Sequence, residues 1–267
     1  MTKELPKKYI NKVHHCDVMD LMKKLPDNSV DMIYGDPDYN VNIVYDGRNY
    51  TTKFEDYLKW YIGLTDECLR VLKPDGNIMM MNYSQPNAHL RVRCLEVPGS
   101  VAKMVEEYVW VYPYNFGMSK RKFTRAHRSI LHITKSKENR FYRNNVAEPY
   151  KNPKDKRVLR LKAEGSKGRM PYSWFENNLV KNVSKEKTIH AAQIPKAVSK
   201  KLIYACTEPG DTVLVLFGGS GSECEVCVEG KRGFITAELQ KKYVDLIRAR
   251  LREGDIPNHY RWKKTKK

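Results

Sequence analysis

The stretch PGDTVLVLFGGSGSECEVCVEGKRGFITAE, residues 209–238, decides the fold class. The apolar run TVLVLF at 212–217 is typical of a buried strand, and the glycine turn GGSG at 218–221 follows it directly. We expect a helix over 223–229 and a second strand over 233–237, which ends at the acid Glu238. This order is typical of nucleoside-binding sites. Glycines let the backbone approach a ligand at a helix N-terminus, and the acid can accept hydrogen bonds from ribose hydroxyls.

The composition of the glycine turn narrows the choice of nucleoside. A dinucleotide site needs a third glycine or alanine where Cys224 stands, and the Gly-Lys-Ser/Thr of a phosphate loop is absent. S-adenosylmethionine, which has a ribose but no phosphate, fits this turn better than NAD or ATP. The alternative is a tight strand-to-helix turn that binds no ligand.

Other parts of the chain alternate between strand and helix patterns. We expect strands over 29–35, 77–82, 108–112 and 129–134, and helices over 54–72, 87–107, 195–206 and 239–252. The segment 73–76, KPDG, is expected to end one helix and turn the chain into the next strand. This alternation predicts an α/β fold with a mostly parallel sheet and helices on both faces.

The charge of the chain indicates its partner. In 267 residues, 49 Lys and Arg stand against 31 Asp and Glu, which gives a net charge of +18. Region 135–187 holds much of this excess, has poor periodicity, and mixes basic with aromatic residues. Such a segment favours contact with nucleic acid over a plain solvated linker. The bland alternative is a basic surface that only aids solubility.

Two observations bear on location and on metals. No apolar run approaches a membrane span and the start, MTKELPKKYINK, lacks a secretory core, so we expect a cytoplasmic protein. Of six cysteines, only Cys224 and Cys227 form a CxxC pair, and the histidines are scattered. We therefore expect two buried small residues there and no metal site.

A second motif, DPDY at 36–39, follows directly after the strand expected over 29–35. Taken together, DPDY, the basic region and FGGSG at 217–221 resemble the β-permuted amino-group DNA methyltransferases, which methylate adenine N6 or cytosine N4. The order of the motifs is similar, and the connecting stretches HHCDVMDLMKKLPDNSVDMIYGDPDY, VLKPDG, HAAQIP and PGDTVLVLFGGSGS also resemble the family. The similarity spans about residues 13–251.

The resemblance implies a class I, Rossmann-like methyltransferase core in permuted order, with an inserted basic target-recognition region. We expect residues 1–134 to form the half with the catalytic motif and 188–252 the half with the cofactor loop. Residues 135–187 would be the target-recognition insert, and 253–267 a basic tail. Double-stranded DNA is the expected partner. A homodimer and a cognate restriction endonuclease acting on the same site are further expectations.

The resemblance also assigns roles to individual residues. The catalytic motif would be Asp36, Pro37, Asp38 and Tyr39. S-adenosylmethionine would be bound by Asp17, Phe217, Gly219, Gly221, Glu238 and Gln193. DNA would be contacted by Lys120, Arg121, Lys122, Arg140 and Arg143.

The chemistry explains these residue types. An exocyclic amino group is a poor nucleophile because its lone pair is delocalised into the base. The Asp36 carboxylate and the Pro37 carbonyl would accept its two hydrogens and localise that lone pair for attack on the cofactor's methyl group. The base must leave the duplex, and Tyr39 would stack on it.

Departures from the family pattern keep alternatives open. Asp38 replaces the second proline, Val215 and Leu216 replace an Asp-Pro pair, Ile194 replaces a lysine, and Arg128 stands where an acid is frequent. Site-specific methylation at adenine N6 is the leading hypothesis, since Asp36 begins the motif. The alternatives are cytosine N4, a DNA-binding subunit that has lost catalysis, and methylation of RNA or of a protein glutamine.

Overall fold

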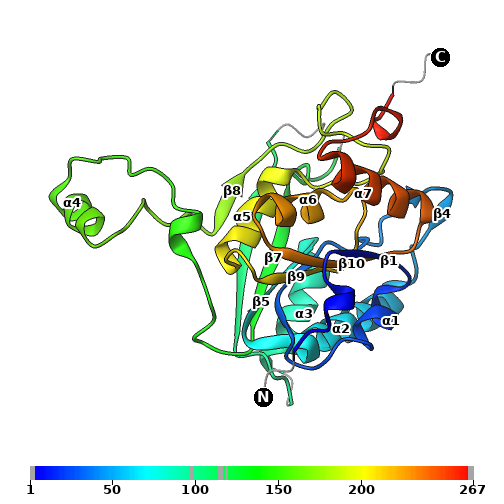
Figure 1. Ribbon diagram of the computed structural model, residues 1–267, viewed down its shortest axis with the longest axis horizontal. Coiled ribbons are helices and arrows are strands. Elements are labelled where there is room, and N and C mark those ends of the chain that lie inside the picture. The colour runs from blue at the N-terminus through cyan, green and yellow to red at the C-terminus, as the bar shows by residue number, and fades with distance from the viewer. Residues whose placement is uncertain (1–3, 97–98, 114–116, 118–119, 264–267) are drawn as a thin grey trace.

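A computed structural model describes residues 4–96, 99–113, 117 and 120–263. Its centre is an eight-stranded sheet in the order β1-β10-β9-β2-β5-β7-β6-β8 (Figure 1). Neighbours from β1 to β5 run parallel, β7 is antiparallel to β5 and β6, and β8 is parallel to β6. The predicted mostly parallel α/β fold is therefore confirmed. The strands are β1 Lys12–His15, β2 Val30–Gly35, β5 Leu72–Asn82, β6 Met104–Val111, β7 His127–Thr134, β8 Trp174–Glu176, β9 Thr212–Val215 and β10 Gly233–Glu238.

Helices cover both faces of the sheet (Figure 1). The alternation of side chains along each strand explains this, because successive residues point to opposite faces. On β2, Ile33 joins the core beneath the N-terminal helices, while Met32 and Tyr34 join the core beneath the C-terminal ones. The first set is α1 Val18–Met22, α2 Phe54–Val71 and α3 Ser84–Glu96, and the second is α5 Lys196–Cys206, α6 Ser222–Glu229 and α7 Lys241–Glu253.

The two halves of the sequence meet where β2 pairs with β9. Ile33 lies opposite Leu214 and Tyr34 opposite Val215 in this parallel pair. From β9 the chain proceeds through α6 to β10, away from β2, and from β2 it proceeds through α2 to β5, away from β9. Strand order thus reverses between β2 and β9. Such a switch point opens a crevice at the carboxyl ends of the strands.

Two of the expected elements differ from the structure. The helix expected over 87–107 is wrong in its second half, since α3 ends at Glu96 and residues 104–107 belong to β6. The burial pattern of β6 explains the error, because it is irregular and lacks a clear period of two. Strand β8 pairs only with residues 109–111 of β6, at its far end. The KPDG segment does not separate helix from strand, because β5 already begins at Leu72 and its pairing with β2 shifts register there.

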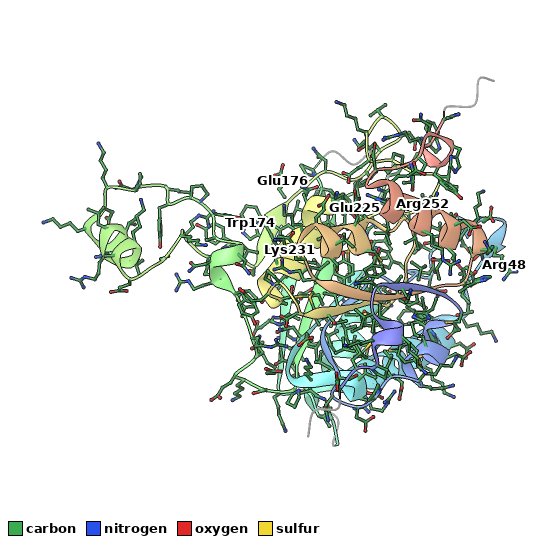
Figure 2. All side chains as sticks on the ribbon, in the orientation of Figure 1. Arg48, Trp174, Glu176, Glu225, Lys231 and Arg252 are labelled. Atoms are coloured by element: carbon green, nitrogen blue, oxygen red, sulfur yellow. The ribbon has the colours of Figure 1, made fainter. Side chains whose placement is uncertain are left out.

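The basic region 135–187 contains more regular structure than its pattern indicates. It holds the 3-10 helix η2 Arg143–Asn145, the helix α4 Lys156–Ala163 and the strand β8, which extends the sheet beside β6. Helix α4 stands apart from the body on a long extended arm (Figures 1 and 2), and none of its residues is buried. Its side chains are therefore free to meet a partner.

Arg140, expected to contact DNA, lies instead among carboxylates. Its guanidinium contacts Asp31 at 2.6 Å, Asp211 at 3.0 Å and Asp75 at 3.1 Å. These three acids stand at the amino-terminal ends of β2, β9 and β5, at the edge of the sheet opposite to the DPDY motif. These contacts argue against the expected DNA role of Arg140, because they neutralise its charge and tie three strands together.

Shorter elements complete the described part. Residues after DPDY form the hairpin β3 Val44–Tyr45 and β4 Arg48–Asn49, and 3-10 turns lie at η1 Lys7–Tyr9 and η3 Asn258–Tyr260. Arg261, in the expected basic tail, pairs with Asp255, and residues 264–267 of that tail lie outside the described residues. No helix in the described ranges has both the length and the apolar character needed to cross a membrane.

Candidate active site

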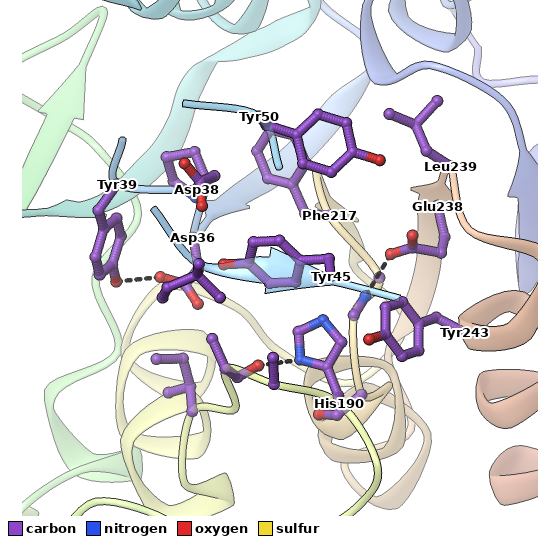
Figure 3. A pocket seen from close by; sticks show the side chains of 18 of the residues that line it. Asp36, Asp38, Tyr39, Tyr45, Tyr50, His190, Phe217, Glu238, Leu239 and Tyr243 are labelled. Carbon is purple, nitrogen blue, oxygen red and sulfur yellow. Dashed lines mark hydrogen bonds between the residues drawn. The ribbon is translucent and has the colours of Figure 1, made fainter. Parts of the chain in front are cut away.

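A cavity of about 590 Å³ opens at the switch point between β2 and β9 (Figure 3). Its volume is typical of sites for small molecules and cofactors. The wall includes residues 36–39 after β2, residues 217–220 after β9 and Glu238 at the end of β10. The two motifs that the sequence singles out, separated by about 180 positions, thus share one cavity.

The glycine turn after β9 is shaped for a closely approaching ligand. Gly219 and Gly221 have positive φ angles of 51° and 77°, a region that side chains disfavour. A Cβ atom on Gly218 would lie 2.6 Å from Ile247 Cδ1, so a side chain at this position would require that methyl group to move. Backbone can therefore face the cavity at the N-terminus of α6, where no side chain shields it.

Glu238 fixes the turn from the neighbouring strand. Its Oε2 accepts a hydrogen bond from the Gly219 amide at 2.9 Å, and its Oε1 accepts one from the Gln240 amide at 2.8 Å (Figure 3). Burial raises the pKa of this carboxyl, and these amide donors oppose the rise. Each carboxylate oxygen keeps a further lone pair, so Glu238 can still accept from ribose hydroxyls.

The other expected cofactor residues also line the cavity, with different engagements. Asp17 follows β1 and caps α1 by accepting from the Met19 amide at 2.8 Å. Phe217 lies 6.1 Å from the ring of Trp60. The side chain of Gln193 is occupied within its own loop, since it accepts from Thr188 and donates to the Glu186 carbonyl at 2.6 Å. Gln193 therefore shapes the loop 186–193 at the wall of the cavity.

The DPDY motif forms the opposite end of the cavity. Pro37 is buried, and the Tyr39 hydroxyl donates a hydrogen bond to Asp36 Oδ1 (Figure 3). The ring of Tyr39 lies 5.1 Å from that of Tyr83, which follows β5. Asp36 thus points into the cavity with one oxygen engaged by a neighbouring hydroxyl.

Burial controls the charge of Asp36. Removal from water raises the pKa of this carboxyl to about 7, and the negative charges of Glu223 and Asp38 add to the rise. The Tyr39 hydrogen bond and the positive charge of Arg128 oppose it. A carboxyl that titrates near neutral pH can both accept a hydrogen bond and take up a proton.

Asp38, the departure from the family motif, has a role in the turn. Its Oδ1 accepts from the Asn40 amide at 2.8 Å, and its carbonyl accepts from the Tyr57 hydroxyl at 2.7 Å. Its Oδ2 is buried and has no hydrogen-bond partner among the described residues. Asp38 therefore holds the loop that follows the motif and adds negative charge to the cavity.

Several lining residues were missed from the sequence. Tyr45 and Tyr50, from the hairpin region, close one side of the cavity, and Tyr50 accepts from Gln240 Nε2 at 2.6 Å. His190 packs against Tyr243 at 4.5 Å, and burial lowers its pKa to about 4. Glu223 accepts from Ser199 at 2.9 Å. Of these residues, only His190 lay in a stretch, HAAQIP, whose resemblance to the family could have pointed to the site.

The expected DNA-contacting residues lie outside the cavity. Lys120, Arg121 and Lys122 are exposed on the loop before β7. Arg143 begins η2, at the base of the arm, and its Nη2 lies 3.4 Å from Ser166 Oγ. These four stay predictions as DNA contacts.

The donor set of the cavity fits S-adenosylmethionine. This molecule carries a positive sulfonium and an ammonium group, and carboxylates outnumber Lys and Arg among the described lining residues. The carboxylates among the described lining residues are Asp17, Asp36, Asp38, Asp56, Glu223 and Glu238. The glycine turn and Glu238 at one end suit its ribose, and aromatic rings flank the space between the ends.

Comparisons with known proteins agree with this geometry. A family model described as DNA methylase, of the N6 and N4 type, matches residues 30–249. The chain is 32% identical to the type II methyltransferase M.BglII of Bacillus subtilis, over 90% of this chain and 69% of that protein. It is 27% identical to the DNA adenine methyltransferase YhdJ of Escherichia coli K12, over 92% and 83% of the two chains.

Solved structures show the same fold. The PvuII DNA methyltransferase, cytosine-N4-specific, superimposes with a TM-score of 0.68 at 17% identity, over 90% of this chain and 85% of that chain. The complex of M1.HpyAVI with SAM gives a TM-score of 0.57 at 22% identity, over 90% and 98%. The chain therefore belongs to the DNA methylase family of N6 and N4 type, whose members transfer a methyl group from S-adenosylmethionine to an exocyclic amino group in DNA.

Proposed function

We propose that this chain methylates the N6 amino group of an adenine flipped out of duplex DNA, with Asp36 and Pro37 as the groups that activate it. The observation that carries the proposal is the partly buried Asp36 carboxyl at the end of β2, in the same cavity as the glycine turn and Glu238. The aspartate at the first position of the motif favours adenine over cytosine.

S-adenosylmethionine, when bound, supplies an electrophilic methyl group. The protein's part is to prepare the amino group. The Asp36 carboxylate accepts one amino hydrogen and the Pro37 carbonyl accepts the other, so that the nitrogen lone pair is localised and directed at the cofactor. Because its pKa is near 7, Asp36 can take up the proton that the amino group loses on methylation.

Tyr39 is placed to meet an arriving base. Its hydroxyl donates to Asp36 Oδ1 and leaves the second carboxylate oxygen for the amino hydrogen. The ring of Tyr39 would then stack on the base, with stacking worth about 1–3 kcal/mol in comparable sites. The contact between Tyr39 and Asp36 keeps the carboxyl partnered while the base is absent.

The test combines labelled cofactor, duplex DNA of mixed sequence, and identification of the methylated nucleoside after digestion. We expect N6-methyladenine, and N4-methylcytosine would replace the adenine assignment with the alternative. Asp36→Ala should abolish transfer and leave DNA binding in place. Methyl transfer by this variant at the rate of the unmodified protein would refute the role of Asp36.

We infer that the arm around α4 and the exposed loop 120–122 hold the DNA duplex. The helix carries Lys156, Arg157, Arg160 and Lys162 and buries none of its residues. Near the base of the arm, the rings of Tyr172 and Trp174 stack at 6.0 Å. Basic side chains bind phosphates with a strong dependence on salt, so an affinity that is equal at low and high salt would contradict this proposal.

A homodimer, a cognate restriction endonuclease and a cytoplasmic location remain predictions from the sequence. Sedimentation of the protein with and without duplex DNA would test the dimer. Protection of the methylated site from a cleaving enzyme encoded beside this chain would test the endonuclease.

A further inference from the structure

Arg128 is a group that the proposed mechanism leaves without a task. It lies at the start of β7 and is the one Lys or Arg among the described residues that line the cavity. In the sheet it stands opposite Trp110, another lining residue, at the end of the cavity where Asp36 and Tyr39 lie. A single cation among six carboxylates is expected to have a defined function.

Aromatic rings hold the guanidinium of Arg128 in place. Its central carbon lies 4.4 Å from the ring centre of Tyr83, 5.0 Å from that of Tyr112 and 5.1 Å from that of Tyr39. Its Nη1 donates to the Tyr112 hydroxyl and to the His127 carbonyl. The group is thus positioned before any ligand arrives.

Part of the guanidinium is left unused. In the described part of the chain, Nε and Nη2 of Arg128 have no hydrogen-bond partner. Neither nitrogen is among the buried polar atoms that lack a partner, so both are accessible to a ligand. Arginine can only donate hydrogen bonds. The base end of the cavity therefore presents acceptors, from Asp36 and Pro37, beside a free donor, from Arg128.

This arrangement of two acceptors and one donor separates the four bases into two pairs. Adenine and cytosine carry an amino group, which donates, next to a ring nitrogen that accepts. At the corresponding position guanine and thymine carry a carbonyl, O6 or O4, which accepts, next to a ring N–H that donates. The acceptors of Asp36 and Pro37 beside the Arg128 donor match the amino group and ring nitrogen of adenine and cytosine. The same protein groups face a carbonyl and a ring N–H in guanine and thymine, and neither contact is then favourable.

We propose that Arg128 donates a hydrogen bond to the ring nitrogen beside the target amino group, N1 of adenine or N3 of cytosine. Arg128 is then a specificity-determining residue that admits adenine and cytosine and rejects guanine, presented by its O6 edge, and thymine. The inference rests on the proposed roles of Asp36 and Pro37, because these place the amino group at that end of the cavity. It adds to them a contact that neither residue can make.

The test removes the contact from both sides. The duplex carries the site methylated by the unmodified protein, with the target as the natural base or as its analogue with the ring nitrogen replaced by CH, 1-deazaadenine or 3-deazacytosine. We expect the unmodified protein to lose about 10- to 100-fold in kcat/KM on the analogue, the cost of leaving a donor unpaired in a closed site. Arg128→Met should lose a similar factor on the natural base and little more on the analogue.

Two further variants separate this contact from a structural effect. Arg125→Met removes the other cation that lies over Tyr83, at 4.0 Å, but Arg125 does not line the cavity. This control should respond to the analogue as the unmodified protein does. Arg128→Lys keeps a charge and a donor and should retain part of the discrimination, which keeps the proposal testable if Arg128→Met fails to fold.

The outcomes distinguish the inference from the function on which it rests. Equal losses on the analogue for the unmodified protein and for Arg128→Met would overturn the role of Arg128, even if Asp36→Ala abolishes transfer as expected. Absence of methylation by the unmodified protein on all mixed-sequence DNA would overturn the proposed function, and the role of Arg128 with it. The proposal is supported if the analogue lowers kcat/KM for the unmodified protein and for Arg125→Met, but not for Arg128→Met.

Discussion

Replacing Asp36 by Asn should make the protein more stable at alkaline pH than at acid pH, relative to the unmodified chain. Burial raises the pKa of this carboxyl from 3.8 to about 7, so the folded state holds the proton more tightly than the unfolded state does. The contribution of this carboxyl to the free energy of unfolding is therefore fully present below pH 3.8, and it is lost as the pH rises through about 7. Asparagine keeps the acceptor for the Tyr39 hydroxyl but has no charge to bury.

The magnitude follows from the titration of one group. Between pH 8.5 and 5.5 the folded carboxyl gains its proton while the unfolded carboxyl stays ionised. This interval covers roughly 1.5 pH units below the folded pKa, which corresponds to about 2 kcal/mol. The free energy of unfolding of the unmodified protein should therefore rise by about 2 kcal/mol, relative to that of Asp36→Asn, when the pH falls from 8.5 to 5.5.

Urea unfolding without cofactor, followed by tryptophan fluorescence at both pH values, measures this double difference. Comparing the two proteins at each pH cancels the titration of all other groups. Parallel pH dependences for the two proteins would refute the reasoning, because Asp36 would then titrate alike in the folded and unfolded states. Methyl transfer gives a second readout, since kcat/KM of the unmodified protein should rise with pH through about 7.

Three further predictions follow from single contacts. Arg140→Met should lower the free energy of unfolding by about 2 kcal/mol, because it removes one of the two cations that pair with the buried Asp31, Lys73 being the other. The salt dependence of DNA binding should stay unchanged, and a shift in it would restore a DNA role. Glu238→Ala should weaken S-adenosylmethionine binding by about 100-fold in calorimetry, while the control Asp245→Ala, on the exposed side of α7, should not weaken it. Equal cofactor affinities of the Glu238→Ala variant and the unmodified protein would reject the ribose role. The double variant Arg157→Ala, Arg160→Ala on α4 should reduce the slope of log DNA affinity against log salt concentration by about 2, without affecting cofactor binding. An unchanged slope would show that the arm does not contact the DNA phosphates.

Local sequence signals predicted much of the core. The strand and turn at 212–221, the helix at 54–72 and the acid at the end of β10 all follow from periodicity and from the conformational freedom of glycine, and the structure contains each of them. These features depend on residues a few positions apart. These local signals failed at β6, whose residues are mostly not buried and do not alternate cleanly between the two faces.

Arg140 and Arg128 show what such signals miss. Arg140 lies in the basic region 135–187 and Arg128 lies shortly before it, and the sequence did not show which distant parts of the fold hold either side chain. Strand pairing places Arg140 among three carboxylates at the far edge of the sheet, and β7 places Arg128 inside the cavity. The partners of a charged side chain determine its role, and these partners are distant in sequence.

The sequence by itself determined that this chain has a parallel α/β core, a glycine turn for a nucleoside, a DPDY motif and a localised positive charge. Only the tertiary structure decided that the motif and the turn share one cavity, because β2 and β9 pair across about 180 residues. It also decided the contact of Tyr39 with Asp36 and the position of Arg128 beside them. Hydrophobic periodicity is a local property, whereas burial, pKa and hydrogen-bond complementarity arise where separate segments of the chain meet.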